Sequence, residues 1–225
     1  ALLEEKGIKV EGDGRSGRSS STTTVATIQS NPLPLIIQEM LTTNDVNTAE
    51  MLLKEIGIAA GGSGTLQAGL NVVIQKLGEW NVPFDGLWIV DGSGLSDANR
   101  MTCQALLAVL QHGSPADAIG TGMPAGGQPG GLLDLDFASG SPLFGKIRAT
   151  TGTMFNYQDG VGGNPGAKTL SGYIPLEDGR TIEFVMLLNG PQIAEQIIYR
   201  PIWELFAGIM GTYLAVPSSA ELGPR

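Results

Sequence analysis

Three short segments of this chain carry side chains suited to acid–base or nucleophilic chemistry. They are Thr42-Thr43-Asn44-Asp45-Val46, Asp91-Gly92-Ser93-Gly94-Leu95-Ser96 and Thr150-Thr151-Gly152-Thr153. A Ser or Thr hydroxyl attacks a carbonyl or relays a proton when a base lies within hydrogen-bond reach, and an Asn amide can hold a substrate peptide group. These segments contain the candidate site residues, and other elements must position them.

Each segment also has a purely structural interpretation. Residues 44–47 would serve as a helix–helix turn with a cap, and Thr150 with Thr151 as β-branched strand residues. The glycines beside Ser93 favour a tight turn in which its hydroxyl bonds the local backbone, and no Gly-x-Ser-x-Gly elbow surrounds it. The local sequence leaves both interpretations open.

The sequence predicts no metal or cofactor. Cys103 is the only cysteine and His112 the only histidine, which is too few ligands for a zinc centre. The glycine pairs lack the strand-to-helix context of a phosphate loop. Because Cys103 precedes the apolar run 106–110, we expect it to be a buried free thiol.

Charge and hydropathy exclude two classes of partner. The 225 residues carry a formal net charge of −9, which repels phosphate backbones and argues against nucleic acid. No stretch of the sequence reaches about 18 apolar residues without a charge, so we expect no membrane-spanning helix. The first residues lack the features of a secretion signal, and without an initiator Met we expect the natural start to lie upstream.

Apolar spacing predicts that the first two thirds of the chain are helical. A helical period runs through residues 33–41, 52–56 and 66–77. We expect Asn47 to cap the second of these helices, with Glu50 completing a capping box. Another helix is predicted at about 102–112, and residues 87–90 have the composition of a short strand.

The last third of the chain predicts a sheet and a closing helix. Residues 146–153, 169–174 and 181–188 have strand patterns, with a hairpin turn at 177–180. Residues 8–10 and 25–28, near the start of the chain, are further strand candidates. An apolar stripe at 193–210 predicts a terminal helix that Pro201 kinks or restarts. We therefore expect an α+β fold of one domain, with a helical subdomain at about 32–144 and the sheet with its helix at about 145–215.

Taken in order, these segments resemble the serine D-Ala-D-Ala carboxypeptidase/endopeptidase family, the class C low-molecular-mass penicillin-binding proteins. Residues 31–53 are similar to the helix pair flanking the family's Ser-x-Asn motif, and Asp91–Ser96 matches its Asp-Gly-Ser-Gly-Leu-Ser turn. Arg148–Thr153 lies where the family has its Lys-Thr-Gly strand, and residues 170–174 resemble the strand that follows. The resemblance covers residues 1 to about 215 and implies a β-lactamase/transpeptidase-like fold whose N-terminal part is missing from this chain.

The resemblance also implies a mechanism whose residues this chain does not retain. The family uses a nucleophilic Ser with a Lys three residues later, but no Ser in this sequence is followed by Lys at that spacing. Aligned on Ala49-Glu50, the Ser-x-Asn positions fall on Asn44, Asp45 and Val46, and valine can neither donate nor accept a hydrogen bond. A shifted alignment of the Ser-x-Asn motif would use Thr42 and Asn44, but it requires a two-residue insertion before Ala49.

The Lys-Thr-Gly position reads Thr150-Thr151-Gly152, so the cation that would face a peptide carboxylate is absent while the strand pattern is kept. Residues 150–153 remain the candidate substrate-binding strand. Three departures in three motifs predict a catalytically deficient homologue that binds at most a peptidoglycan stem peptide or an envelope protein.

Two alternatives remain open. An upstream or partner segment would supply Ser-x-x-Lys to an active site built with Thr42, Asn44 and Thr151, or the fold would serve assembly alone. The resemblance implies an extracytoplasmic location. Because the sheet would otherwise expose an edge and an apolar face, we expect an N-terminal segment or a second polypeptide to complete the domain.

Overall fold

The computed structural model describes residues 2–9, 11–12, 16–17, 24, 26–154 and 166–214, in two units, Ala1–Ser30 and Asn31–Arg225. The first unit contains helix α1 (Leu2–Glu5). The strands expected at 8–10 and 25–28 do not form in their described residues, since neither has a partner strand to pair with. Val10 and Val25 lie outside the described residues.

The second unit begins with three consecutive helices, as the apolar period predicts: α2 (Leu33–Thr43), α3 (Val46–Ala59) and α4 (Leu66–Glu79). Thr65 caps α4 by accepting a hydrogen bond from the Ala68 amide. The backbones of α3 and α4 approach so closely that a Cβ at Gly69 would lie 2.0 Å from the Leu53 carbonyl oxygen. Glycine is therefore required at this crossing.

Two shorter helices follow, α5 (Cys103–Leu110) and α6 (Ala118–Gly122). The strand expected at 87–90 is reduced to one bridge between Trp88 and Arg100, because no longer partner runs beside it. The expected burial of Cys103 is wrong, since the side chain is exposed. Ala105 is the buried residue of this turn, and a separation of two residues, about 200° around a helix, points Cys103 away from that face.

The three predicted strands form one antiparallel sheet in the order β1 (Arg148–Met154), β2 (Gly166–Pro175), β3 (Thr181–Gly190). The predicted hairpin joins β2 to β3, with Leu176 N–H donating to the Arg180 carbonyl at 2.8 Å and Gly179 at φ 83°. Helix α7 (Gln196–Leu214) follows and runs unbroken through Pro201, so the helix does not restart there.

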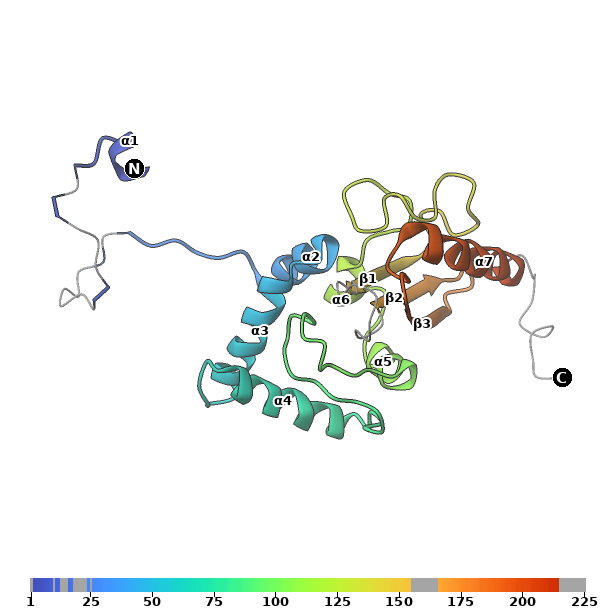
Figure 1. The fold of residues 1–225 in the computed structure, drawn as a ribbon, viewed down its shortest axis with the longest axis horizontal. Helices are drawn as coiled ribbons and strands as arrows, with labels where there is room; N and C mark the ends of the chain where they lie inside the picture. Colours follow the sequence, from blue (N-terminus) through green and yellow to red (C-terminus); the bar gives the residue numbers. More distant parts are fainter. Residues whose placement is uncertain are drawn as a thin grey trace. The chain divides into compact units, whose positions relative to one another are not determined.

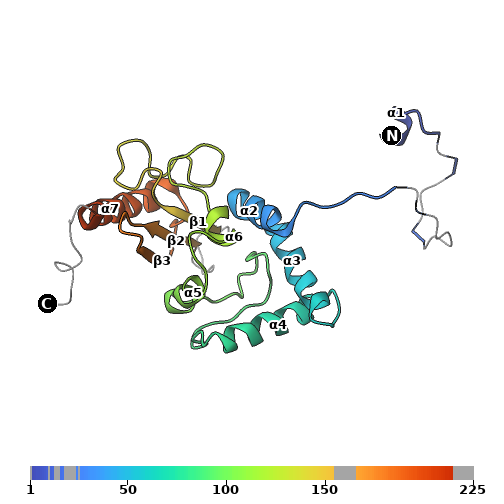
Figure 2. The same cartoon turned by 180° about the vertical axis from the view of Figure 1, so that it is seen from behind.

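Helix α7 lies along the sheet in Figures 1 and 2. The main core is packed between α7 and the sheet. Ala149, Leu170 and Phe184 of the sheet pack with Tyr199 and Trp203 of α7 in that core. A second cluster lies on the other face, where Leu110 of α5 and Met123 meet Tyr173 and Val185. The sheet is covered on both faces, which is the expected α+β architecture.

No helix in the described ranges is long and apolar enough to cross a membrane.

Candidate functional site

The corner between α2 and α3 contains the Ser-x-Asn-like residues. Asn44 ends α2 in the left-handed conformation, at φ 56°, and Asp45 caps α3 by accepting hydrogen bonds from the amides of Asn47 and Thr48. The expected cap at Asn47 is therefore wrong, because Asp45 precedes the first turn and its carboxylate reaches two otherwise unpaired amides. The Thr48 hydroxyl also donates to Asp45, and this bond is the main cause that lowers the pKa of the Asp45 carboxyl.

The hydroxyl groups of this corner are already engaged in structure. Thr42 Oγ1 donates to the Gly122 carbonyl at the end of α6, at 3.0 Å, and Thr43 Oγ1 donates to the Glu39 carbonyl within α2. Val46 is half-buried at the first position of α3. The side chains that the corner exposes are those of Thr43, Asn44 and Asn47.

The segment 122–126 connects this corner to the candidate substrate strand. Gly122 lies against α2, where a Cβ would be 3.0 Å from the Gln38 Cα. The next two residues contact β1. The Met123 carbonyl accepts a hydrogen bond from Arg148 Nη1, and the Pro124 carbonyl accepts one from the Ala149 amide at 3.1 Å. The structure thus brings the α2–α3 corner and the start of β1 to the two sides of one short segment.

Strand alternation places the candidate residues of β1 on opposite faces of the sheet. Thr150 is half-buried opposite Ser171, on the face that also carries Tyr173. Thr151 is buried opposite Leu170, on the face covered by α7, and its hydroxyl has no hydrogen-bond partner in the described part of the chain. The two threonines that follow Ala149 therefore have different surroundings.

Among the described residues, none pairs with the outer edge of β1 beyond its first residues. The Ala149 amide pairs outward with Pro124, and a period of two places the backbone groups of Thr151 and Thr153 at the same edge. Within the described sheet, β2 is the only strand beside β1. Gly152 leaves room for the Thr169 hydroxyl, which accepts from the Gly152 amide at 2.8 Å.

Lys168 is the lysine that lies nearest to this motif along the sheet register, and it is on the α7 face. It is buried opposite Thr153, donates to Thr153 Oγ1 at 2.7 Å and lies over the rings of Tyr199 and Trp203. Burial lowers the pKa of this ammonium and outweighs the nearby Asp136 carboxylate, which raises it, so the pKa lies below its ordinary value. Thr150 faces the opposite side of the sheet, so the ammonium of Lys168 does not lie on the face of Thr150.

The turn Asp91–Ser96 docks on α3 rather than on the sheet. Asp91 accepts from the amides of Gly94 and Ser96 and from Asn99 Nδ2, each at 2.8 Å. Burial raises the pKa of Asp91, but these hydrogen bonds outweigh it and leave the pKa below its ordinary value. Glu50 accepts from the amides of Gly92 and Ser93, which holds the turn against α3.

Sequence reasoning did not identify Glu50 and Lys168 as positioning residues. The sequence predicts a capping-box role for Glu50, and its place next to Ala49 in the matched motif is the one signal that it could have another task. Lys168 carried no signal, because its burial depends on α7. In the described ranges, no three His, Cys, Asp or Glu side chains come together as metal ligands.

Known proteins resemble this chain in both sequence and fold. Residues 1–200 match the D-Ala-D-Ala carboxypeptidase 3 (S13) family. The D-alanyl-D-alanine carboxypeptidase of Actinomadura sp. (strain R39) is 31% identical over 198 residues, covering 84% of this chain and 35% of that protein. Carboxypeptidase DacB of Mycolicibacterium smegmatis is 29% identical over 174 residues, covering 74% of this chain and 36% of that protein. The chain thus spans about a third of the length of these relatives.

Penicillin-binding protein 4 (dacB) from Haemophilus influenzae, solved with a novel β-lactam, shares the fold with a TM-score of 0.71 and 20% identity, over 95% of this chain and 48% of that chain. The uncomplexed structure of that protein gives a TM-score of 0.66 at 20% identity, over 83% of this chain and 41% of that chain. Since the family match extends over most of the sequence, the chain belongs to the D-Ala-D-Ala carboxypeptidase 3 (S13) family.

Proposed function

We propose that this chain is the C-terminal portion of a catalytically deficient serine-type D-Ala-D-Ala carboxypeptidase homologue. The observation that carries the proposal lies within the matched motifs, where Val46 and Thr150 stand at the positions of the family's Asn and Lys. Valine can neither donate nor accept a hydrogen bond, and threonine carries no positive charge to face a peptide carboxylate. These 225 residues also contain no Ser followed three residues later by Lys, so no hydroxyl within them is activated in the family's way.

The surroundings of the remaining hydroxyls support this assignment. In the shifted alignment the relay would need Thr42, whose hydroxyl donates to the Gly122 carbonyl. Asp45 is committed to the cap of α3, and the Thr151 hydroxyl is buried on the α7 face. An active site built from these groups would need each of them to leave its present environment.

The residual role that we propose is binding of a peptidoglycan stem peptide along the outer edge of β1. An extended peptide adds to an open strand edge through main-chain hydrogen bonds, and residues 151–153 offer such an edge. Without the lysine, a peptide carboxylate would lose its charge partner, so we expect weak binding. This role implies a location outside the cytoplasmic membrane.

We also propose that further polypeptide completes the domain. In the described sheet, β3 pairs with β2 alone, so its far edge is open. Ile197, Leu205 and Ile209 of α7 are exposed, with 78%, 66% and 60% of their surfaces accessible. An N-terminal segment or a second protein would cover both features. A soluble, cooperatively melting monomer of 23.4 kDa in light scattering, with no co-purifying polypeptide, contradicts this part of the proposal.

The main test uses the 225-residue chain with labelled penicillin, followed by intact-mass measurement. We expect no covalent adduct, whereas the Haemophilus protein provides the positive control. A mass increase of one penicillin on any Ser would overturn the deficiency.

The binding role is tested separately, by titrating a peptide that ends in D-Ala-D-Ala and following backbone amide resonances. Shifts centred on Thr150–Thr153 are expected, without release of D-Ala. If these amides do not respond, the stem-peptide role is wrong and assembly alone becomes the better account.

A further inference from the structure

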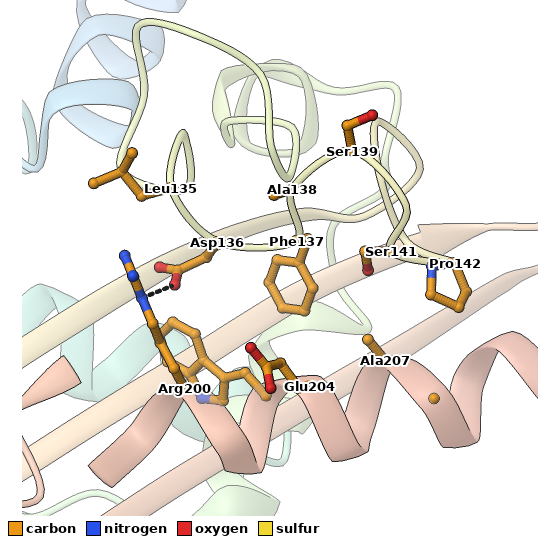
Figure 3. A pocket seen from close by; sticks show the side chains of 12 residues that line it. Leu135, Asp136, Phe137, Ala138, Ser139, Ser141, Pro142, Arg200, Glu204 and Ala207 are labelled. Carbon is orange, nitrogen blue, oxygen red and sulfur yellow. Dashed lines mark hydrogen bonds and ion pairs between the residues drawn. The ribbon is translucent and has the colours of Figure 1, made fainter. Parts of the chain in front are cut away.

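Helix α7 has two different flanks above the sheet. On one flank, Figure 3 shows Arg200 and Glu204 beside the loop 135–142, and a cavity of about 370 Å³ lies between this loop and the helix. On the other flank, the ring of Phe206 lies against that of Phe184 in β3, with centroids 5.1 Å apart. Because β3 is the last strand of the described sheet, the second flank borders its open edge.

The exposed apolar residues of α7 gather on the second flank. A helix turns by about 100° per residue, so three of them lie within about 100° of Phe206 on its solvent side. They are Ile198, Leu205 and Ile209, all exposed, and they are called the α7 stripe below. Ile197 is exposed as well, but it lies about 180° from Phe206. The α7 stripe therefore runs beside the open edge of β3.

The edge of β3 has none of the features that keep an edge strand from pairing. Edge strands of monomers are commonly very short, interrupted by proline or marked by lysine. β3 has ten residues, none of them proline or lysine, and Glu183 is its single charge. Glu183 faces away from α7, because its neighbour Phe184 faces toward it. On the α7 face, β3 thus presents no charge beside the stripe.

We propose that a second copy of this chain covers this surface, with the two β3 strands paired antiparallel across a two-fold axis perpendicular to the sheet. The inference rests on the proposed completion of the domain and names the partner. Two copies of one strand can pair in this way because the axis presents each edge to itself in reverse. An axis at Val185 places Glu183 opposite Leu187, so the one charge of the strand meets no like charge.

The same axis brings the two α7 stripes together, because both helices then lie on one face of a continuous sheet. α7 lies over β2 and β3, since Trp203 is beside Lys168 of β2 and Phe206 is beside Phe184 of β3. A helix midway between these strands would have its axis two strand spacings, about 10 Å, from that of the copy. Packed helices are separated by about 8–10 Å, so the stripes would be in contact.

The other edge of the sheet is less suited to a second copy. The Ala149 amide at the start of β1 donates to the Pro124 carbonyl, so only the later part of that edge is unpaired among the described residues. Pairing of β3 with β1 of another chain would also leave the α7 stripes apart. Two-fold pairing instead uses the ten residues of β3 and about half of the 19 residues of α7. A stable interface needs about 20–30 residues a side.

The test is light scattering of the 225-residue chain in reducing buffer, over a range of concentrations. We expect a mass of twice 23.4 kDa. Leu205→Lys places a charge in the stripe and should raise the dimer Kd at least about tenfold, because like charges meet where apolar side chains packed. Ile197→Lys adds the same charge to the same helix outside the stripe and should leave the Kd unchanged. Both positions are exposed, so both variants are expected to fold.

Hydrogen exchange shows whether β3 forms the interface. In a single chain, alternate amides of β3 face the open edge and exchange quickly, whereas pairing with a second strand protects all of them. We expect protection throughout residues 182–189 of the parent chain and fast exchange of alternate amides in Leu205→Lys. A dimer whose β3 amides still alternate would use another surface and would overturn the inference, as would equal Kd values for Leu205→Lys and Ile197→Lys.

Other occupants give different results. A co-purifying polypeptide that protects β3 would show that self-pairing is wrong, while the proposed completion of the domain would stand. A 23.4 kDa monomer at every concentration would also overturn self-pairing. It would contradict completion of the domain only if it melts cooperatively. Assemblies of more than two chains would overturn the two-fold arrangement.

Discussion

Glu50 of α3 accepts hydrogen bonds from the backbone amides of Gly92 and Ser93, at 2.8 and 3.2 Å, across 42 and 43 residues of sequence. This contact joins the helix that follows the Ser-x-Asn-like corner to the Asp91–Ser96 turn. Gly92 fits because the turn presses on α3, where a Cβ would lie 2.9 Å from the Ala49 carbonyl oxygen. The turn therefore acts as a brace for α3.

Gly92→Ala should destabilise the chain by about 1–3 kcal/mol, because the added methyl overlaps backbone that cannot easily move. The matched control is Gly78→Ala in α4, where a Cβ meets nothing within 4 Å and alanine favours the helix. Chemical denaturation of both variants measures the difference. Equal stability of the two would show that the turn is not pressed against α3.

Asp45→Ala should cost about 1 kcal/mol, because two amides at the start of α3 lose their acceptor. Asn47→Ala, within the exposed first turn, should change the free energy of unfolding by less than about 0.5 kcal/mol. The same denaturation measurement decides between the two capping assignments. A larger loss for Asn47→Ala would restore the capping box expected from the sequence.

Combined replacement of Val46 by Asn and Thr150 by Lys should not produce carboxypeptidase activity. Both changes restore groups that handle substrate, and neither supplies a nucleophile. Release of D-Ala from a stem-peptide mimic is the measurement, with intact mass after penicillin treatment as a second readout. If turnover appears, Ser93→Ala in the same background tests whether that serine is responsible.

The carboxyls of Asp91 and Asp136 should titrate on opposite sides of the ordinary aspartate pKa of 3.8. Burial raises the pKa of Asp136 and outweighs Arg200 and Lys168, whereas hydrogen bonds from Asn99 and two amides lower that of Asp91. The stability that Asp91 contributes is full above pH 3.8 and is lost as the pH falls through its folded pKa. For Asp136, the contribution is full below pH 3.8 and is lost as the pH rises through its folded pKa.

Carboxyl-carbon NMR titration of the folded chain gives both midpoints. A midpoint for Asp91 above that of Asp136 would contradict the assignment. Asp136→Asn should also remove the decrease in unfolding free energy that accompanies the rise in pH just above 3.8.

The fold was predictable where local pattern and tertiary packing agree. The helical periods of α3 and α4 and the alternation in β1–β3 have buried faces that match apolar residues, so the predicted elements form. Helix α2 also forms where predicted, although none of its residues is fully buried. Residues 87–90 have an equally apolar pattern, yet a strand requires a partner, and Trp88 finds one only at Arg100. No local pattern could reveal that.

The candidate site was likewise predictable only in part, because strand alternation can be read from the sequence and tertiary contacts cannot. Thr150 and Thr151 were identified as a strand, and strand alternation alone implies that they face opposite sides. Which side carries α7 is a property of the folded chain. The pairing of Asp136 with Arg200 joins residues 64 positions apart, and the loop that contains Asp136 had no feature beyond its glycines and prolines to suggest a cavity.

The outward position of Cys103 has a practical consequence for every experiment on this chain. As the single cysteine of the sequence, exposed at the first residue of α5, it should accept one maleimide label without competition from other thiols. The same accessibility allows two chains to become joined through a disulfide in air. Measurements of molecular mass in solution should therefore be made in a reducing buffer, so that a covalent dimer is not mistaken for a docked partner.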